Sequence, residues 1–422
     1  MARGRFVWSF CDMWPGPLVK AGRLCHLRAN RILLKRSAMF DATDTPEYRL
    51  TDARIVTADA VIHGSVVVKD GRIAGIGAPD APGIGLDGDY LIPGLVDLHT
   101  DHVETHVFPR NGVVWAPAPA LAAHDGVVVA GGVTTVFDSL CVGAAMEQSE
   151  RRALLVPLMD ALERGRSAQA FRADHLVHLR CEISDPATAE LVAEVIAAPF
   201  VRLVSVMDHT PGDRQILDIE AWVQEFARDM KVSVEVSRAM TDDLLERSGR
   251  VGPGVRAQVI SAARTRGIPV MSHDDRTEAH VDEAMAEGVA VSEFPTTRAA
   301  AARAKAVGQA VVVGAPNYVR GGSQSGNVAV RELLEHGLVD ALASDYVPGS
   351  LLTAAFAIAD DTELGISLPQ AVAMVSQRPA QIAGLTDRGT LSEGQRADMV
   401  RVRRTEGHTH VASVWRTGRR VF

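Results

Sequence analysis

The stretch Leu91 to His106 reads LIPGLVDLHTDHVETH, an apolar run followed by a crowd of possible metal ligands. Imidazoles and carboxylates are the side chains that hold zinc, manganese or iron in proteins. The stretch is therefore either the polar end of a catalytic strand or a histidine-rich surface turn, and the rest of the chain decides between them. The ligand-type residues of the stretch are His99, Asp101, His102, Glu104 and His106.

Apolar, strand-like segments alternate with helical stretches through the middle of the chain. Continuous apolar strands separated by helices indicate a parallel sheet covered on both faces, and eight such units predict an α/β fold, the (β/α)8 TIM-like barrel. A doubly wound open sheet would show the same alternation, but the GxGxxG turn typical of it does not follow the first strand. The expected strands are 91–100, 133–139, 176–183, 201–209, 268–275, 289–295, 310–316 and 340–346.

Both ends of the chain have the alternating pattern of hairpin strands. Runs such as YRLTDARIVT and SVVVKD precede the barrel, and GQRADMVRVRR and THVASVWRTGRRVF follow it. Strand-rich pieces at opposite ends can form one domain if the segment between them folds as an insertion. We therefore expect a small β-sandwich domain from residues 39–90 and 385–422, with the metal-dependent barrel at 91–384.

Residues 1–38 differ in composition, because they hold many Arg and Lys residues and a single acid, Asp12. Such a bias occurs in targeting segments. A folded pattern begins at Met39, which favours a disordered arm or an incorrectly assigned start over a targeting signal.

The composition is that of a globular protein, with 47% hydrophobic and 23% charged residues. The net charge of -8 argues against a nucleic-acid partner. No apolar run approaches the roughly 18 to 20 residues that cross a bilayer, so no membrane partner is expected. The four cysteines have no CxxC spacing, which indicates reduced thiols and a cytoplasmic location.

Ligand-type residues recur where the expected barrel strands end, and active sites of such barrels lie at those ends. A single Asp there is more often a helix cap, and a single His more often a structural hydrogen-bonding residue. Six such residues on five strands instead favour a metal centre, and mixed histidine and carboxylate ligation suits Zn, Mn or Fe. The predicted metal ligands are His99, Asp101, Glu182, His209, His273 and Asp345. Other histidines near these ends, which could assist, are His102, His106, His124, His178 and His280.

Cationic and polar groups near the same strand ends suggest an anionic ligand. Arginine binds phosphate oxygens in bidentate fashion, although a loop arginine is usually a solvated charge. A Gly/Ser-rich segment precedes a helical run after the seventh strand, where phosphate sites recur in barrels, although such a segment alone is usually a plain connection. The arginines are Arg110, Arg180, Arg214, Arg276 and Arg320, and the segment includes Gly322, Ser323, Ser325 and Asn327.

The chain resembles the amidohydrolase superfamily from about Tyr48 to Phe422. The resemblance is carried by PGLVDLHTD, by the β pieces at both ends, and by the closing GTLSEGQRADMV of Gly389 to Val400. It implies metals that activate water and a strand 8 aspartate, here Asp345, that takes the proton. Two positions depart from the common pattern: Asp101 stands where a second histidine is usual, and no lysine ends a strand. Glu182 could replace the usual bridging carboxylated lysine.

Seven stretches resemble the PhnM proteins of the carbon-phosphorus lyase pathway: LHTDHVETHVFPR, HDGVVVAGGVTTVFDS, HLRCEIS, DHTPGDRQ, MSHDD, VGAPNYVRGGSQSGNVA and LASDYVPGSLL. The resemblance implies that α-D-ribose 1-methylphosphonate 5-triphosphate is hydrolysed to the 5-phosphate and pyrophosphate. Among the arginines it favours Arg110, Arg180 and Arg320, which lie inside these stretches. Barrels of this type often pair, so a homodimer is expected. Two alternatives stay open: an amidohydrolase acting on a C–N bond, and a non-catalytic assembly protein.

Overall fold

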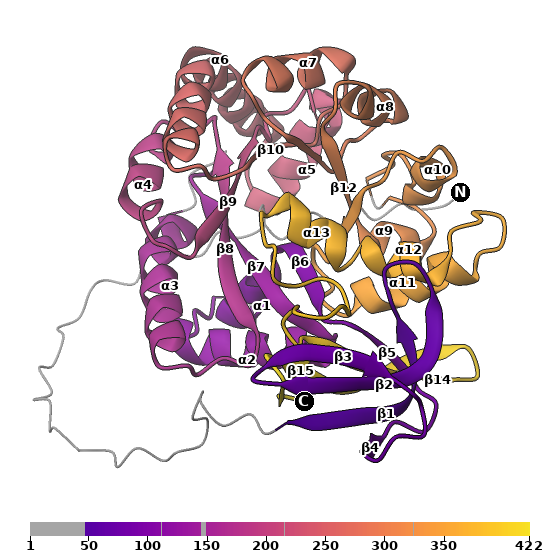
Figure 1. Ribbon diagram of the computed structural model, residues 1–422. Helices are drawn as coiled ribbons and strands as arrows, with labels where there is room; N and C mark the ends of the chain where they lie inside the picture. Colours follow the sequence, from indigo (N-terminus) through magenta and orange to yellow (C-terminus); the bar gives the residue numbers. More distant parts are fainter. Residues whose placement is uncertain (1–46, 111, 145–148, 215, 324) are drawn as a thin grey trace, which may run out of the picture.

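Parallel strands form a barrel at the centre of the molecule, with helices around it (Figure 1). The computed structural model describes residues 47–110, 112–144, 149–214, 216–323 and 325–422. Hydrogen bonds join the eight strands in the order of the sequence, from β6 to β13. The strands are β6 Leu95–Thr100, β7 Val133–Val142, β8 Asp174–Glu182, β9 Val201–Met207, β10 Val270–His273, β11 Val291–Glu293, β12 Ala310–Gly314 and β13 Ala341–Ala343. The predicted TIM-like barrel is thus confirmed.

The barrel closes at a seam where β13 meets β6. Thr100 and Asp345 form a parallel bridge there. The amide of Asp345 donates to the carbonyl of His99 at 2.9 Å, and the amide of Asp101 donates to the carbonyl of Asp345 at 3.0 Å. Two residues before His99 on β6, Asp97 Oδ1 accepts a hydrogen bond from the amide of Ser344 at 3.0 Å. The seam therefore brings the first and last predicted ligands together through their backbones.

Helices cover the outside of the barrel because their apolar faces pack on the outward side chains of the strands (Figure 1). Leu162 of α3, for example, belongs to the same buried cluster as Phe137 of β7 and Leu179 of β8. No helix among the described residues is both long and apolar enough to cross a membrane. The helices are α1 His102–Val107, α2 Pro117–Ala130, α3 Ser149–Ser167, α4 Thr188–Val195, α5 Ile219–Met230, α6 Val234–Thr265, α7 Glu278–Ala286, α8 Arg298–Ala306, α9 Ala315–Arg320, α10 Val330–Glu335, α11 Ser350–Asp360, α12 Leu368–Ala373 and α13 Gln377–Ile382.

A second, mostly antiparallel sheet joins the two ends of the chain, in the order β16-β15-β14-β5-β1-β2-β3, with β4 paired to β1. Ile92 of β5 faces Val400 of β14, so strands from both sides of the barrel are neighbours. The sheet has its own buried cluster, which includes Ile55, Met399 and Trp415. Its strands are β1 Tyr48–Val56, β2 Val61–Lys69, β3 Arg72–Gly77, β4 Ile84–Gly85, β5 Tyr90–Pro93, β14 Met399–Thr405, β15 His408–Arg416 and β16 Arg419–Arg420.

The structure leaves part of the domain prediction untested. The expected arm, residues 1–38, and the expected domain start at residue 39 lie outside the described residues. The two-domain boundaries therefore stay predictions.

The expected first strand, 91–100, is in fact two strands that belong to different sheets. β5 ends at Pro93 and β6 begins at Leu95. Between them, the amide of Gly94 donates to the carbonyl of Asp398 at 2.8 Å, which ends the chain's path along the small sheet. A Cβ at Gly94 would lie 2.2 Å from Thr134 Oγ1. The prediction missed this break because both strands are apolar and a single glycine separates them.

Candidate metal centre and phosphate pocket

All six predicted metal ligands lie at or just after the carboxyl ends of barrel strands, in the region that we call the barrel mouth. His99 lies one residue before the end of β6, Glu182 ends β8 and His273 ends β10. Asp101, His209 and Asp345 follow β6, β9 and β13 within two residues. Asp345 is half-buried and the others are buried. The opening stretch therefore is the end of a barrel strand.

The seam gathers His99, Asp101 and Asp345, each with a possible ligand atom within 4.8 Å of the other two. His99 Nε2 lies 3.4 Å from Asp101 Oδ1. Both Asp101 oxygens accept hydrogen bonds from Arg180 Nη1 at 2.8 Å. Burial alone would raise the pKa of Asp101, but Arg180 and His99 outweigh it and hold that pKa below its usual range.

Asp345 has the opposite electrostatic environment from Asp101. Burial and the charge of Asp101 together raise the pKa of Asp345 to about 7. Its φ of 54° lies in the left-handed region, which aspartate tolerates better than most residues. Two neighbouring carboxyls with pKa values pushed apart are typical of a site that binds a cation and moves a proton.

A second group of possible ligands consists of His209, His273 and Asp274, again with atoms within 4.8 Å of one another. His273 Nε2 lies 3.5 Å from Asp274 Oδ2. Asp274 was not among the predicted ligands. It follows the last residue of β10 directly, so the sequence signal was present in MSHDD, but only the histidine was chosen.

Glu293, at the end of β11, links the two groups by hydrogen bonds to one histidine of each. The sequence prediction missed this residue. The side chain is fully buried. Its Oε1 accepts a hydrogen bond from His99 Nδ1 and its Oε2 accepts one from His273 Nδ1, both at 2.7 Å. These bonds commit both Nδ1 atoms, so the Nε2 atoms carry the lone pairs that can bind a metal ion.

Glu182 has a similar relation to His209. Its Oε2 accepts a hydrogen bond from His209 Nδ1 at 2.9 Å, and its Oε1 accepts one from Ser184 Oγ at 2.7 Å. Glu182 belongs to none of the possible metal-binding groups found among the described residues. The geometry supports an orienting role, and the predicted bridging role stays a prediction.

The environment of His178 indicates whether the side chains at the mouth suit a metal ion. Its Nδ1 donates to the carbonyl of Leu98 at 3.1 Å, and its buried Nε2 has no hydrogen-bond partner among the described residues. A possible ligand atom of His178 lies within 4.8 Å of those of His99 and Glu293. Burial lowers the pKa of His178 to about 4, so the ring is neutral at pH 7. A neutral imidazole with an unused lone pair beside carboxylates fits a divalent metal.

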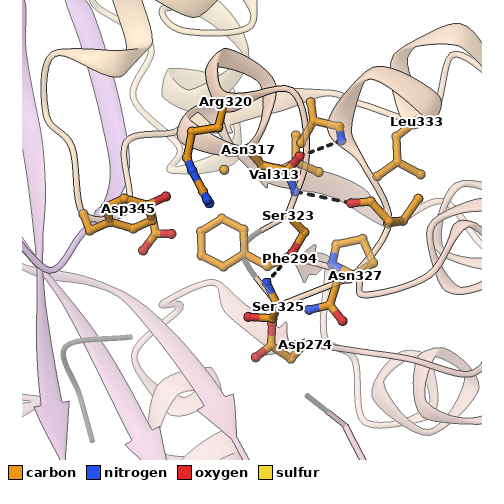
Figure 2. Close-up of a pocket in the computed structure, with 15 residues that line it drawn as sticks. Asp274, Phe294, Val313, Asn317, Arg320, Ser323, Ser325, Asn327, Leu333 and Asp345 are labelled. Carbon is orange, nitrogen blue, oxygen red and sulfur yellow. Dashed lines mark hydrogen bonds between the residues drawn. The ribbon is translucent and has the colours of Figure 1, made fainter. Parts of the chain in front are cut away.

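A pocket that is open to solvent lies beside the mouth and joins it to the loop that follows α9 (Figure 2). Asp345, Asp274 and Arg320 all line the pocket. Figure 2 shows the side chain of Arg320 directed toward the space between Asp345 and Phe294. Polar side chains complete the lining: Asn317, Ser323, Ser325 and Asn327. Four of the predicted substrate residues, Arg320, Ser323, Ser325 and Asn327, therefore share one pocket.

The other predicted substrate residues do not line this pocket. Arg110 is exposed and forms a bridge with Val113. Arg180 is buried in the ion pair with Asp101. The amide of Gly322 donates to the carbonyl of Asn317 at 2.9 Å, which closes the end of α9. This amide is used to cap a helix, so it is not directed at a ligand.

Comparison with known proteins agrees with the fold and the site. The model of the amidohydrolase family matches residues 181–422. Solved structures with the same fold include 5-methylcytosine deaminase from Klebsiella pneumoniae, with a TM-score of 0.59 and 16% identity over 89% of this chain and 98% of that one. Dihydropyrimidinase from Brevibacillus agri gives a TM-score of 0.54 and 15% identity over 89% of this chain and 95% of that one. The chain therefore belongs to the amidohydrolase superfamily.

Within the superfamily, the relatives differ widely in similarity to this chain. The α-D-ribose 1-methylphosphonate 5-triphosphate diphosphatase of Escherichia coli strain K12 is 39% identical over 88% of this chain and 100% of its own length. Imidazolonepropionase from Mesorhizobium japonicum is 28% identical over 82% of this chain and 90% of its own. The chain is a member of the PhnM family, that of the first of these relatives.

Proposed function

We propose that this protein is a metal-dependent diphosphatase of phosphonate catabolism that hydrolyses α-D-ribose 1-methylphosphonate 5-triphosphate to the 5-phosphate and pyrophosphate. The observation that carries the proposal is the pocket that joins Asp345 and Asp274 at the mouth to Arg320 and the Ser/Asn side chains. The 39% identity with the Escherichia coli diphosphatase supports the choice of substrate. The partner is thus a phosphorylated ribose phosphonate.

The proposed metal ligands are the imidazoles and carboxylates of the two groups at the mouth. His99 and His273 would bind through Nε2, because their Nδ1 atoms donate to Glu293. Glu182 orients His209, and Arg180 holds Asp101. One or two ions, Zn or Mn, would lower the pKa of bound water to about 7 and polarise a phosphoryl oxygen. We propose that Asp345 accepts the proton of the attacking water, because it lies between the metal ligands and the pocket.

The substrate is an anion, so the pocket must offset its charge. Arg320 can hold two phosphate oxygens through its planar guanidinium. Ser323 and Ser325 offer hydroxyl donors and Asn327 an amide donor beside it. Donors placed around the oxygens that gain charge stabilise the transition state more than the ground state. Arg110 would act only if the triphosphate extends beyond the pocket.

A second candidate reaction is hydrolysis of a C–N bond. The 28% identity with imidazolonepropionase favours it, because the same mouth could activate water for an amide carbon. The cationic and hydroxyl groups of the pocket count against it, since an uncharged amide would leave the Arg320 guanidinium without an anionic partner.

Release of pyrophosphate from the triphosphate substrate tests the proposal. We expect the purified protein, loaded with Mn or Zn, to release pyrophosphate, and Asp345→Asn to lower kcat by a factor of about 10² to 10⁴, the range for a lost proton acceptor. Circular dichroism checks that the variant is folded. The matched control is Asp80→Asn, which changes an exposed aspartate of the small domain. A wild-type enzyme that hydrolyses cyclic amides but not the triphosphate would refute the diphosphatase.

A further inference from the structure

Three imidazoles of helices α1 and α2 face one another, and none of them belongs to the ligand groups described so far. His102 and His106 lie four residues apart on α1 and therefore on one helical face. His124 comes from α2. The ring centroids are 5.0 Å apart for His102 and His106, 5.7 Å for His102 and His124, and 6.1 Å for His106 and His124. One possible ligand atom of each lies within 4.8 Å of the other two.

Each of the three rings has a buried nitrogen without a hydrogen-bond partner among the described residues. These atoms are Nδ1 of His102, Nε2 of His106 and Nδ1 of His124. The side chain of His124 is fully buried. A buried polar atom without a partner is energetically unfavourable. Three such atoms in one place are unusual in a folded protein. Each can present a lone pair, and a metal cation is the ligand that three lone pairs would coordinate.

The lone pair of His124 is set by a chain of hydrogen bonds behind it. His124 Nε2 donates to Asp138 Oδ1 at 2.8 Å, and Asp138 Oδ2 accepts from His175 Nδ1 at 2.8 Å. His175 Nε2 in turn lies 3.2 Å from Asp125 Oδ1. Because Nε2 of His124 carries the proton, its Nδ1 must carry the lone pair. A carboxylate behind an imidazole is the usual support of a histidine metal ligand.

The carboxylate support behind His124 lies on the outer face of the barrel wall, although His102 directly follows the mouth residue Asp101. His175 and His178 lie three positions apart on β8, so their side chains leave opposite faces of the strand. His178 shares a cluster with His99 of the mouth, whereas His175 contacts Asp138, which bonds to His124 of the outer helix α2. The outer imidazoles and the mouth ligands have no residue in common.

We propose that His102, His106 and His124 form a second metal site, which binds Zn²⁺ through three imidazole nitrogens and leaves the fourth position to water. Zinc accepts neutral imidazoles at about 2.0–2.1 Å in tetrahedral geometry, which places the nitrogens roughly 3.3 Å apart, so the rings would draw inward as the ion binds. His102 and His106 are partly exposed, which provides a route for the ion and space for the water. The bound ion would tie α1, whose N-cap is Asp101, to α2. The proposal does not depend on the reaction at the mouth.

Metal counting in a variant with a disabled mouth tests the site. The background is His99→Asn with His273→Asn, which removes two mouth ligands. After metal removal and equilibration with Zn²⁺, we expect this variant to keep one tightly bound zinc per chain, counted by mass spectrometry, and to melt at a higher temperature with zinc than without. Adding His102→Asn and His106→Asn should remove both the ion and the zinc-dependent rise in Tm.

The control for adventitious binding is His408→Asn with His410→Asn in the same background, because these histidines form an exposed neighbouring pair in β15. We expect it to leave the bound zinc unchanged. Zinc X-ray absorption of the mouth-disabled protein, which needs no change in the outer cluster, should show three imidazole ligands. No zinc in the folded background protein, or equal zinc after loss of His102 and His106, would overturn the proposal, as would a spectrum without imidazole scattering.

Discussion

Glu293 shows how one buried carboxylate can organise a metal centre without being one of the expected ligands. It holds His99 from the first barrel strand and His273 from the fifth, both at 2.7 Å. Burial opposes ionisation, but the charge of His99 and the hydrogen bonds from His273 and His99 outweigh burial and hold the pKa of Glu293 well below its usual value. The charged carboxylate is thus stabilised by the rings that it orients.

We expect Glu293→Gln to weaken metal binding at the mouth by a factor of about 10 to 100, the range for a lost supporting carboxylate. An amide has one acceptor oxygen, so one of the two imidazoles loses its partner and can turn. Titration against a competing chelator measures the change. Glu278→Gln, an exposed change on α7, should leave the affinity unaltered. An unchanged affinity in a folded Glu293→Gln protein would show that the imidazoles are held by other contacts.

At the scale of single residues, the sequence predicted which residues lie at strand ends better than it predicted which face of the strand each side chain occupies. The six predicted ligands reached the mouth because a histidine or acid at a strand end has little freedom of position. Glu293 and Asp138 carry the same signal, an acid near the end of an apolar strand, yet Glu293 faces the mouth and Asp138 faces α2. Only the register of each strand separates these cases, and a difference of one residue reverses the face.

At the scale of elements, the break at Gly94 decides how the two sheets share one stretch of chain. Leu91 and Ile92 pair within the small sheet, and Leu95 enters the barrel beside β7. The close approach of Thr134 leaves no room for a side chain at the crossing. The three-residue run PGL therefore works as a joint between domains.

We expect Gly94→Ala to lower the free energy of unfolding by about 1–3 kcal/mol, the usual cost of overpacking a buried site. Thr134 supplies the two atoms that lie nearest the added Cβ, at 2.2 and 2.7 Å, so Thr134→Ala should recover part of the loss in the double variant. Urea unfolding of the four proteins gives the coupling energy. Gly75→Ala is the control, since nothing lies within 4 Å of a Cβ there. Strictly additive losses would contradict the clash.

Helices and strands were predicted well where a hydrophobic pattern extends over many residues, and poorly where an element is only a few residues long. All eight barrel strands occur near their expected positions because each lies within an apolar run bounded by helical stretches, although β11 and β13 span only three residues. None of the expected elements covers the segment after Asp101, which forms the helix α1. Six residues are too few to display a helical period, so the two histidines on its face could not be distinguished from a polar turn.

At the scale of the whole molecule, Asp174 ties the small sheet to the barrel. It begins β8 and accepts hydrogen bonds from Arg388 at 2.8 Å, Arg396 at 2.6 Å and Arg416 at 2.9 Å. Burial raises the pKa of Asp174, but these three arginines outweigh burial and hold the pKa below its usual range. Three charge-assisted contacts meet at one carboxylate, so its loss affects all of them.

We expect Asp174→Asn to lower the free energy of unfolding at pH 7 by about 2 kcal/mol, the value for hydrogen bonds to charged groups. The folded pKa is below the unfolded value of about 3.9, so this contribution is present above pH 4 and disappears as the pH falls further. Urea unfolding at pH 7 and pH 3 should therefore give a smaller difference at pH 3. Asp87→Asn, which removes an exposed partner of Arg401, should cost less than about 1 kcal/mol. Equal losses at both pH values would rule out the charge as the cause.

The pairing of the two chain ends in one sheet was predictable because both ends show alternation and the segment between them can fold as an insertion. The ion pairs that fasten that sheet to the barrel were not. Arg388, Arg396 and Arg416 are spread over the last segment of the chain, and Asp174 lies far before them. Contacts between distant surface charges depend on the docking of finished domains, which local patterns do not encode.

The barrel seam also determines when the barrel can close during synthesis of the protein. Asp97 and Ser344, which meet across the seam, lie 247 positions apart. At about 5–20 residues per second, the ribosome needs roughly 12 to 50 s to add that length. During this interval the seam edge of β6 lacks its partner strand β13, and Asp345 has not yet been synthesised. Completion of the proposed metal site at the mouth must therefore wait until the last barrel strand has been made, whereas His102, His106 and His124 are all synthesised early.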